Sequence, residues 1–283
     1  RCSRPARFIG TLESADGPRQ VRIADADGEC VVGARLLVGA DGTRSAVREA
    51  LGIGADEHDY AQTLFVARLR AERAPDGTAY ERFCSDGPTA LLPRGDRHYG
   101  LIHAVARDAA DAVAALDENA FLARIQHVFG WRVGRLLACG PRSAYPIARV
   151  VAQRTVAPRA LLVGNAAQTI HPIGAQGFNL GLRDALTLAE LIGDARAADP
   201  QSDPGAEPLL RRHAARRTED RAQTLAFSDG LARVTANASG LLRPLRSAGL
   251  FAVDRLPSVR ARLVAGAMGY RGEVPALCRG PRP

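Results

Sequence analysis

The sequence predicts an α/β fold in which a mostly antiparallel β-sheet domain is inserted into a domain with a parallel sheet. Two short apolar runs, residues 35–39 and 160–164, share the pattern Arg-x-Leu-Val-Gly or a close variant, and both end in glycine before a polar turn. Such runs are typical of strands buried on both faces of a parallel sheet. The segment between them alternates like antiparallel strands, and the last part of the chain has helical periodicity.

The first part of the chain predicts a hairpin and then the first buried strand. Residues 7–12 and 19–24 alternate in polarity around the turn signal Asp16-Gly17-Pro18. After the apolar run at 35–39, residues 45–51 predict a short helix.

The middle of the chain predicts an antiparallel sheet with one helix. The helix is expected at 117–129, where Phe121, Leu122, Ile125 and Val128 recur at helical spacing. Such a run of strands favours a separate domain. The expected strands, separated by Gly, Pro and Asp turns, are 62–69, 79–84, 89–93, 98–106 and 143–151.

Helices dominate after the second buried strand. Residues 179–193 predict a long helix with one apolar stripe formed by Leu182, Ala185, Ala189 and Ile192. A loop at 199–208 follows, then expected helices at 209–228, 229–250 and 257–269, and an irregular tail from Pro275. We therefore predict a parallel-sheet domain at 1–57 and 153–200, an inserted sheet domain at 58–152, and a helical region at 201–283.

Composition indicates an ordinary globular protein of about two domains: 283 residues, 46% hydrophobic and 24% charged. No run approaches the ~20 apolar residues that span a bilayer, and the first residues lead into no apolar segment of a signal peptide. The five cysteines are scattered and never spaced as C-x-x-C. This spacing argues against a metal site and favours a reducing cytoplasm.

The net charge of +8 is carried by arginine alone, because the chain contains no lysine. The excess fits a solvated basic surface, and it also fits attraction to an anionic membrane face or to acidic partners. Nucleic-acid binding is not expected, because aromatic residues total 5% and no basic stretch is interleaved with them.

Residues 164–181 carry the strongest functional signal, because they leave a buried strand, turn through small residues and enter a long helix. Ligands in open α/β sheets lie beyond the carboxyl ends of the strands, and a helix N-terminus stabilises negative charge. Any strand–turn–helix needs glycines, but the fixed spacing of Asn165, Pro172 and Asn179 favours a ligand site. Asn165 is suited to bind a sugar-like hydroxyl.

Two motifs resemble those of flavoprotein aromatic hydroxylases. The segment from Gly164-Asn165-Ala166-Ala167-Gln168 through His171-Pro172 to Asn179 resembles the second FAD motif of that family, G-D-A-A-H then P-x-x-G-x-G-x-N. Its Asn and Gln variants look most like the ubiquinone-biosynthesis hydroxylases of the 2-polyprenyl-6-methoxyphenol hydroxylase type. The segment from Leu37 to Ser45, followed by Arg48, resembles the family's D-G motif. The resemblance spans nearly the whole chain.

The resemblance implies a Rossmann-like FAD-binding domain and assigns residues to the cofactor. Asn165 is expected near the ribitol chain, and the ring is expected against His171-Pro172 and the backbone amides of residues 177–179. Asp41 is also expected to order its own loop. No metal ligand and no catalytic side chain are assigned. The expected cofactor-binding residues are Asp41, Gly42, Arg44, Gly164, Asn165, Pro172, Gly174, Ala175, Gln176, Gly177, Phe178 and Asn179.

The function that the resemblance implies is a flavin-dependent monooxygenase that hydroxylates the aromatic ring of a polyprenyl phenol in ubiquinone biosynthesis. NAD(P)H is expected to reduce FAD, and O2 to react with the reduced flavin to give a C4a-hydroperoxide. The protein is expected to be cytoplasmic, and peripheral contact with the inner membrane face and partners in ubiquinone biosynthesis stay open. A stripe of Val259, Leu263 and Ala267 beside Arg260 and Arg262 fits a membrane interface and equally fits helix packing.

The chain departs from the family pattern in two places. Gly174-Ala175 stands where Ala-Gly is usual, which leaves the exact substrate open. No G-x-G-x-x-G follows a strand near the N-terminus, although that fingerprint cradles the FAD pyrophosphate. We therefore expect an incomplete FAD domain whose first βαβ unit lies upstream of Arg1, and a chain that alone is inactive. The alternatives are a hydroxylase of a soluble phenol and a non-catalytic scaffold subunit.

Overall fold

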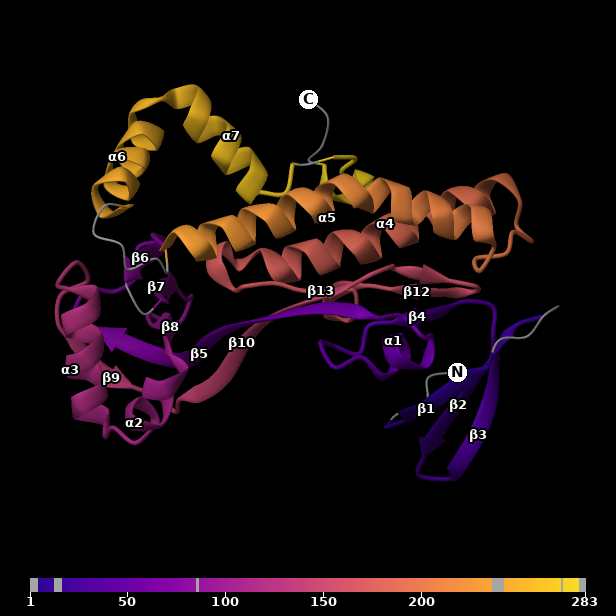
Figure 1. Cartoon of the computed structure of the whole chain (residues 1–283), viewed down its shortest axis with the longest axis horizontal. Helices are drawn as coiled ribbons and strands as arrows, with labels where there is room; N and C mark the ends of the chain where they lie inside the picture. The colour runs from indigo at the N-terminus through magenta and orange to yellow at the C-terminus, as the bar shows by residue number, and fades with distance from the viewer. Residues whose placement is uncertain (1–4, 13–16, 85–86, 236–241, 271, 280–283) are drawn as a thin grey trace. The chain divides into compact units, whose positions relative to one another are not determined.

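The computed structural model describes residues 5–12, 17–84, 87–235, 242–270 and 272–279 (Figure 1). The chain divides into two compact units. The first contains residues 1–58, 149–228 and 256–283, and the second contains residues 59–148 and 229–255. The predicted class is confirmed, because parallel strands, an antiparallel sheet and C-terminal helices all form.

A small parallel sheet lies at the centre of the first unit. Strands β4 (Leu37–Gly39) and β12 (Ala160–Leu162) pair in parallel, and β11 (Val156–Ala157) pairs antiparallel with β12. The two apolar runs are therefore neighbours in space. The predicted burial is confirmed for β12, but it is wrong for β4, in which Val38 is 39% exposed. Because they are parallel, their carboxyl ends lie at the same edge of the sheet.

A three-stranded antiparallel sheet forms the start of the first unit. The predicted hairpin is confirmed as β1 (Arg7–Leu12) and β2 (Arg19–Asp25). Sequence periodicity misses β3 (Gly28–Ala34), which pairs with β2 along its whole length. Its residues are exposed up to Ala34, so no alternation of buried and exposed positions marks the strand.

Two helices, α4 and α5, are longer than periodicity predicts. Helix α4 (Gln176–Ala198) extends the predicted 179–193 at both ends, and α5 (Glu207–Thr235) is continuous. The predicted break between 228 and 229 is wrong, since Ser228 lies buried inside α5 and its hydroxyl donates to the His171 carbonyl at 3.0 Å. Of the predicted helix 229–250, residues 236–241 lie outside the described residues. Three further helices are α1 (Ala46–Ala50), α6 (Leu242–Arg255) and α7 (Pro257–Ala267).

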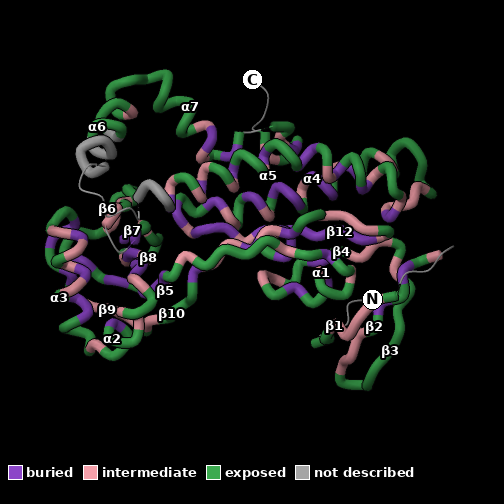
Figure 2. Tube along the Cα trace, viewed as in Figure 1, coloured by how far each residue is buried: buried purple, intermediate pink, exposed green. Residues whose placement is uncertain are grey.

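The buried face of α4 is not the apolar stripe seen in the sequence. Buried and exposed positions alternate along α4 (Figure 2). Leu182, Ala185 and Ala189 are exposed, whereas Arg183 and Asp184 are buried. Ile192, the fourth residue of the stripe, is half-buried and packs against a hydrophobic cluster. The stripe therefore predicts the helix correctly, but its packing wrongly at three of its four positions. The physical reason is that α5 supplies partners for the buried charges, so their burial is compensated.

A buried ion-pair network joins α4 to α5, which run side by side (Figure 1). The Arg183 guanidinium lies 2.7 Å from Asp220, and Arg217 lies 2.8 Å from Asp184. Arg217 also contacts Asp220 at 2.5 Å, so two cations and two anions alternate. Removal of one partner from such a network leaves an uncompensated buried charge.

The second unit is built on an antiparallel sheet with strand order β10-β5-β8-β7-β6, and β9 also pairs with β5. All predicted strands are confirmed, whereas β9 and the short helix α2 (Ala110–Ala114) were not predicted. Strand β5 begins at Ala55, before the predicted residue 62. The sequence misses this early start because most of the first residues are exposed and give no apolar signal. The strands are β5 (Ala55–Ala71), β6 (Tyr80–Cys84), β7 (Gly87–Pro93), β8 (Tyr99–Ala106), β9 (Leu136–Cys139) and β10 (Ser143–Ala152).

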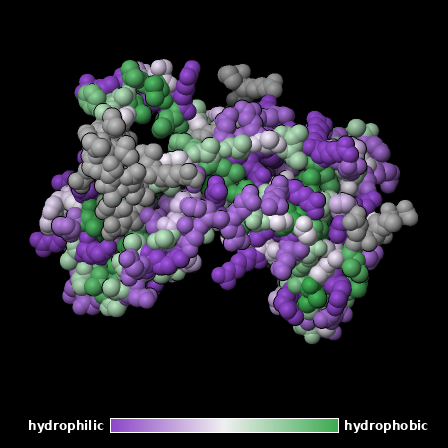
Figure 3. All heavy atoms as spheres, in the orientation of Figure 1, coloured by the Kyte–Doolittle hydropathy of each residue, from purple (hydrophilic) through white to green (hydrophobic). Residues whose placement is uncertain are grey.

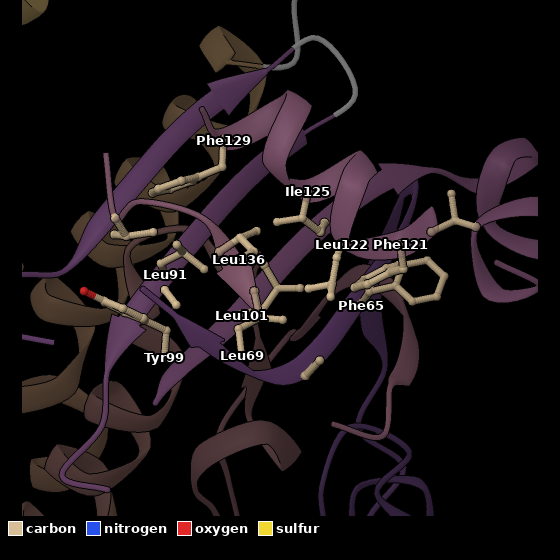
Figure 4. Close-up of a cluster of buried hydrophobic side chains, with 14 of the residues drawn as sticks. Phe65, Leu69, Leu91, Tyr99, Leu101, Phe121, Leu122, Ile125, Phe129 and Leu136 are labelled. Carbon is tan, nitrogen blue, oxygen red and sulfur yellow. The ribbon is translucent and has the colours of Figure 1, made fainter. Parts of the chain in front are cut away.

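Helix α3 (Glu118–Phe129) supplies the core of the second unit. Asp117 caps its start, because the carboxylate accepts the Ala120 N–H at 2.7 Å, and Gly130 ends it with a φ of +86°. Its buried side chains pack on the sheet (Figure 4). Phe129 is buried, whereas the predicted core position Val128 is only half-buried.

Replacement of Phe121 by alanine should destabilise the protein. The Phe121 ring is fully buried, lies 6.3 Å from the Phe65 ring and has the Arg142 guanidinium 4.7 Å above it. We expect Phe121→Ala to lower the free energy of unfolding by about 3–5 kcal/mol, measured by urea denaturation. The control Leu137→Ala removes a side chain that is 44% exposed, and we expect a change within about 0.5 kcal/mol. Equal losses would contradict the assigned core.

The Asp220 carboxylate should make stability depend on acid pH. Burial raises its pKa, but hydrogen bonds and charge attraction from Arg183 and Arg217 outweigh this, and its pKa lies below the usual value. The ion pairs therefore stabilise the fold fully above the unfolded pKa of about 3.9, and this stabilisation is lost as the pH falls through the lower folded pKa.

Asp220→Asn should lower the free energy of unfolding at neutral pH by about 3–5 kcal/mol and flatten its acid dependence. Urea denaturation between pH 3 and pH 7, roughly the range that brackets an aspartate pKa, measures both effects. The control is Asp254→Asn, whose side chain is exposed. An acid dependence that is identical in wild type and Asp220→Asn would show that this carboxylate does not titrate as described.

Candidate cofactor site

The two sequence motifs meet where β4 and β12 end. The Val163 N–H continues the strand pairing by donating to the Gly39 carbonyl at 2.9 Å. Beyond the strands, the hydroxyls of Thr43 and Thr169 lie 2.8 Å apart. The D-G motif and the second motif, far apart in the sequence, therefore form one surface of the first unit.

Arg48 fixes the two motifs to each other. Its guanidinium donates to the Ala166 carbonyl and to the Thr43 carbonyl, each at 3.0 Å. One half-buried side chain thus holds a carbonyl from each loop. Because guanidinium donors have a rigid fork geometry, this contact sets the spacing of the two loops.

Asp41 orders the D-G loop. Its two carboxylate oxygens accept the Ser45 hydroxyl at 2.5 Å and the Val47 N–H at 3.0 Å, which fixes the entry into α1. The expected role of Asp41 in its own loop is therefore visible in the geometry. Gly42 has a φ of +86°, which favours glycine. Arg44 is exposed and forms no hydrogen bond or ion pair with another described residue.

The turn after β12 is held by the passing helix. Gly164 has a φ of +59°, and its N–H donates to the Asp184 carboxylate at 3.2 Å. A Cβ atom added at Gly181 would lie 2.8 Å from the Gly164 Cα, which is closer than real contacts. Helix α4 therefore touches the turn, and Gly181 is required for this approach.

Asp184 is the supporting residue that sequence reasoning missed. The carboxylate oxygen that accepts the Gly164 N–H also accepts the side-chain amide of Gln168 at 2.7 Å, and the other oxygen accepts from Arg217. Arg221 in turn donates to the Gln168 side-chain oxygen at 2.9 Å. The only sequence signal is an acidic residue in the middle of a helix, which more often marks an exposed face.

The loop before α4 contains two consecutive left-handed residues, Gly174 with φ +71° and Ala175 with φ +51°. Because both positions have the same backbone preference, Gly-Ala and Ala-Gly each place one alanine in a left-handed conformation. The swapped order is therefore physically equivalent to the usual one. No side chain caps the start of α4, so the first N–H groups of the helix have no acceptor within the helix.

The side chains around that helix start have different environments. Phe178 is 79% exposed, and Asn165 and Asn179 are also exposed. Gln176 is buried, and its amide donates to the carbonyls of Gly174 and Ala267 at 3.0 and 2.8 Å. Its side chain therefore ties the loop to the end of α7, and only its backbone remains at the helix start.

His171 is buried and held in one orientation. Its Nδ1 accepts the Ile173 N–H at 3.1 Å, so this nitrogen carries no proton. Its carbonyl accepts the Ser228 hydroxyl. The ring is thereby fixed at the base of the loop that leads through Pro172 to α4.

These features fit FAD. A flavin cofactor needs a stretch of backbone that it can approach closely, hydrogen-bond donors for its negatively polarised oxygens, and a polar side chain for its ribitol chain. A Cβ at Gly42 would meet no atom within 4 Å, the start of α4 is uncapped, and Asn165 is exposed beside Gly164. The assignment of the twelve residues to FAD remains a prediction.

Comparison with known proteins identifies the family. The model described as "FAD binding domain" matches residues 4–201. The ubiquinone hydroxylase UbiL of Rhodospirillum rubrum is 37% identical over 279 residues, which cover 98% of this chain and 64% of the relative. The 3-demethoxyubiquinol 3-hydroxylase of Escherichia coli is 32% identical over 268 residues, which cover 93% and 66%. The chain spans slightly less than two thirds of the length of these curated relatives.

Solved structures show the same fold. The p-nitrophenol 4-monooxygenase PnpA of Pseudomonas putida superposes with a TM-score of 0.78 at 14% identity, over 95% of this chain and 67% of that chain. The anhydrotetracycline hydroxylase OxyS of Streptomyces rimosus has a TM-score of 0.68 at 25% identity, over 93% and 51%. The chain therefore belongs to the FAD-binding domain family, and its ubiquinone hydroxylase relatives confirm the resemblance carried by the two motifs.

Proposed function

We propose that the protein is an FAD-dependent monooxygenase that hydroxylates the aromatic ring of a polyprenyl phenol in ubiquinone biosynthesis. NAD(P)H is the proposed reductant and O2 the second substrate. The observation that carries the proposal is the convergence of the D-G loop and the uncapped α4 loop at the ends of two parallel strands. The names of the ubiquinone hydroxylase relatives support the substrate class.

The residues at this edge have separate proposed tasks. The N–H groups of Gly177, Phe178 and Asn179 hold the pyrimidine end of the flavin, because a helix N-terminus stabilises negative charge there. Asn165 binds the ribitol chain, and Arg44, which has no partner among the described residues, binds a phosphate group. When bound, FAD supplies the redox chemistry that activates O2. The protein orients the phenol and excludes water.

The experiment that tests the function uses the purified product of the complete gene. We expect a flavin absorption spectrum, and NAD(P)H oxidation that a prenylated phenol stimulates and that yields a hydroxylated product. Equal stimulation by a short soluble phenol would favour the soluble-phenol hydroxylase. A protein that stays colourless after addition of FAD would overturn the proposal and favour the scaffold subunit.

The close approach of α4 to the Gly164 turn should be needed for FAD binding. Gly181→Ala places a Cβ against the Gly164 Cα, so the turn must move, and we expect FAD affinity to fall about tenfold or more, which corresponds to about 1.4 kcal/mol. Gly193→Ala is the matched control in the same helix, because a Cβ there meets nothing within 4 Å. Flavin fluorescence titration measures both. Unchanged affinity in Gly181→Ala would remove this turn from the proposed site.

Helix α7 supports the proposal of a peripheral contact with the inner membrane face for a cytoplasmic protein. Val259, Leu263 and Val264 are between 41% and 45% exposed, and Arg260 and Arg262 lie on the same short helix. Figure 3 shows apolar side chains gathered at the surface here. No helix in the described part of the chain is long and apolar enough to cross a membrane. Proteins of ubiquinone biosynthesis are the alternative partners of this surface.

Vesicle sedimentation separates the two kinds of partner. We expect the purified protein to sediment with vesicles that contain phosphatidylglycerol, and Leu263→Glu to abolish this by placing a charge in the apolar surface. Leu137→Glu, a change at another exposed leucine, is the control. Absence of vesicle binding by the wild type would favour a protein partner.

A further inference from the structure

A cavity beside α5, next to the ion-pair network, is lined by positively charged side chains and by no acidic ones. It has a volume of about 340 Å³ and lies between the segment that follows β10 and one face of α5. Arg154, Arg217 and Arg221 line it, and none of its lining residues is acidic. Thr155 and Thr218 add hydroxyl groups. None of the residues assigned to FAD lines this cavity.

Two of the three guanidinium groups form no hydrogen bond or ion pair with a carboxylate of the described residues. Arg221 is half-buried, and it donates to the Gln168 side-chain oxygen and to the Ala152 carbonyl, which are neutral groups. Burial lowers the pKa of Arg221, and the more distant charge of Asp184 only partly opposes this. Arg154 is exposed, and its one hydrogen bond to a described residue is a long contact of 3.5 Å with the Leu51 carbonyl. In the described part of the chain, no carboxylate is hydrogen-bonded to Arg154 or Arg221.

Arg217 provides a donor that the ion-pair network does not use. Its Nε and Nη2 atoms contact Asp184 and Asp220, but its Nη1 is buried and has no hydrogen-bond partner among the described residues. An unsatisfied buried donor costs free energy, and it needs an explanation when it occurs in a native structure.

The neighbouring cavity shows what a neutralised site looks like. It has a volume of about 540 Å³ and shares Arg154 with the first. Its other arginines are paired, because Arg159 lies 2.7 Å from Asp203 and Arg211 contacts Glu207. Both cavities are lined by arginines, but Glu207 lines the larger one and no acidic residue is among those that line the smaller one.

We propose that the cavity lined by Arg154, Arg217 and Arg221 binds the phosphate group of a small phosphorylated molecule. Guanidinium groups bind phosphate oxygens through paired, charge-assisted hydrogen bonds, and a phosphate would neutralise the two arginines that lack carboxylates. The volume lies at the lower end of the range for small-ligand sites, about 300–1,000 Å³. Because Arg221 also donates to the Gln168 side chain, this single arginine would link the ligand to the second motif.

The test is isothermal titration of the purified chain with inorganic phosphate, pyrophosphate and ADP, with sodium chloride at matched ionic strength as the blank. We expect binding of at least one of these phosphates, about tenfold weaker in Arg154→Gln, which is the loss expected for one charge-assisted hydrogen bond. Arg154 is exposed, so this variant should fold normally. Arg221→Lys keeps the charge and loses the fork, and we expect an intermediate loss.

Arg211→Gln is the matched control, because it removes the same charge from another exposed arginine, which lies on α5 and outside the cavity. Equal weakening in Arg211→Gln and Arg154→Gln would overturn the site in favour of general surface charge. The absence of binding to every soluble phosphate and to vesicles containing phosphatidic acid would also overturn it. Binding to those vesicles alone, lost in Arg154→Gln but kept in Leu263→Glu, would support the site and assign its phosphate to a lipid headgroup.

Discussion

The carboxylate of Asp184 is the contact on which the geometry of the candidate cofactor site depends. One oxygen accepts the Gly164 N–H and the Gln168 amide, and the other accepts from Arg217 on α5. Loss of the cation that pairs with a buried carboxylate strongly destabilises the folded protein. The turn after β12 and the packing of α4 on α5 therefore depend on the same group. A change in helix packing would alter the turn after β12 through the two hydrogen bonds that Asp184 accepts from Gly164 and Gln168.

The use of arginine and never lysine suits this arrangement. The Arg217 guanidinium bridges two carboxylates, and Arg48 holds two carbonyls in different loops. An ammonium group is a compact, strongly hydrated charge and lacks the rigid fork needed for such bridging. Arginine is therefore better suited than lysine to these two positions, whatever the origin of the bias in composition.

The sequence predicts local structure and the motif loops well because their signals are local. The apolar runs around Val38 and Leu161 identify the parallel strands, and glycines mark the turns at Gly42 and Gly164. What it misses depends on distant partners. Most of the predicted apolar stripe of α4 is exposed, whereas Arg183 and Asp184 are buried, because α5 compensates their charges. The role of Gln176 in contacting the Ala267 carbonyl likewise needed the tertiary structure.

The paired left-handed residues at Gly174 and Ala175 affect how this loop changes during evolution. Glycine is favoured at both positions and alanine costs about 1 kcal/mol at either. The orders Gly-Ala and Ala-Gly can therefore interconvert by single substitutions through Gly-Gly, an intermediate that relieves backbone strain. No step on that path requires a compensating mutation elsewhere. A sequence profile that demands one fixed order at these positions would exclude chains whose loop has the same shape.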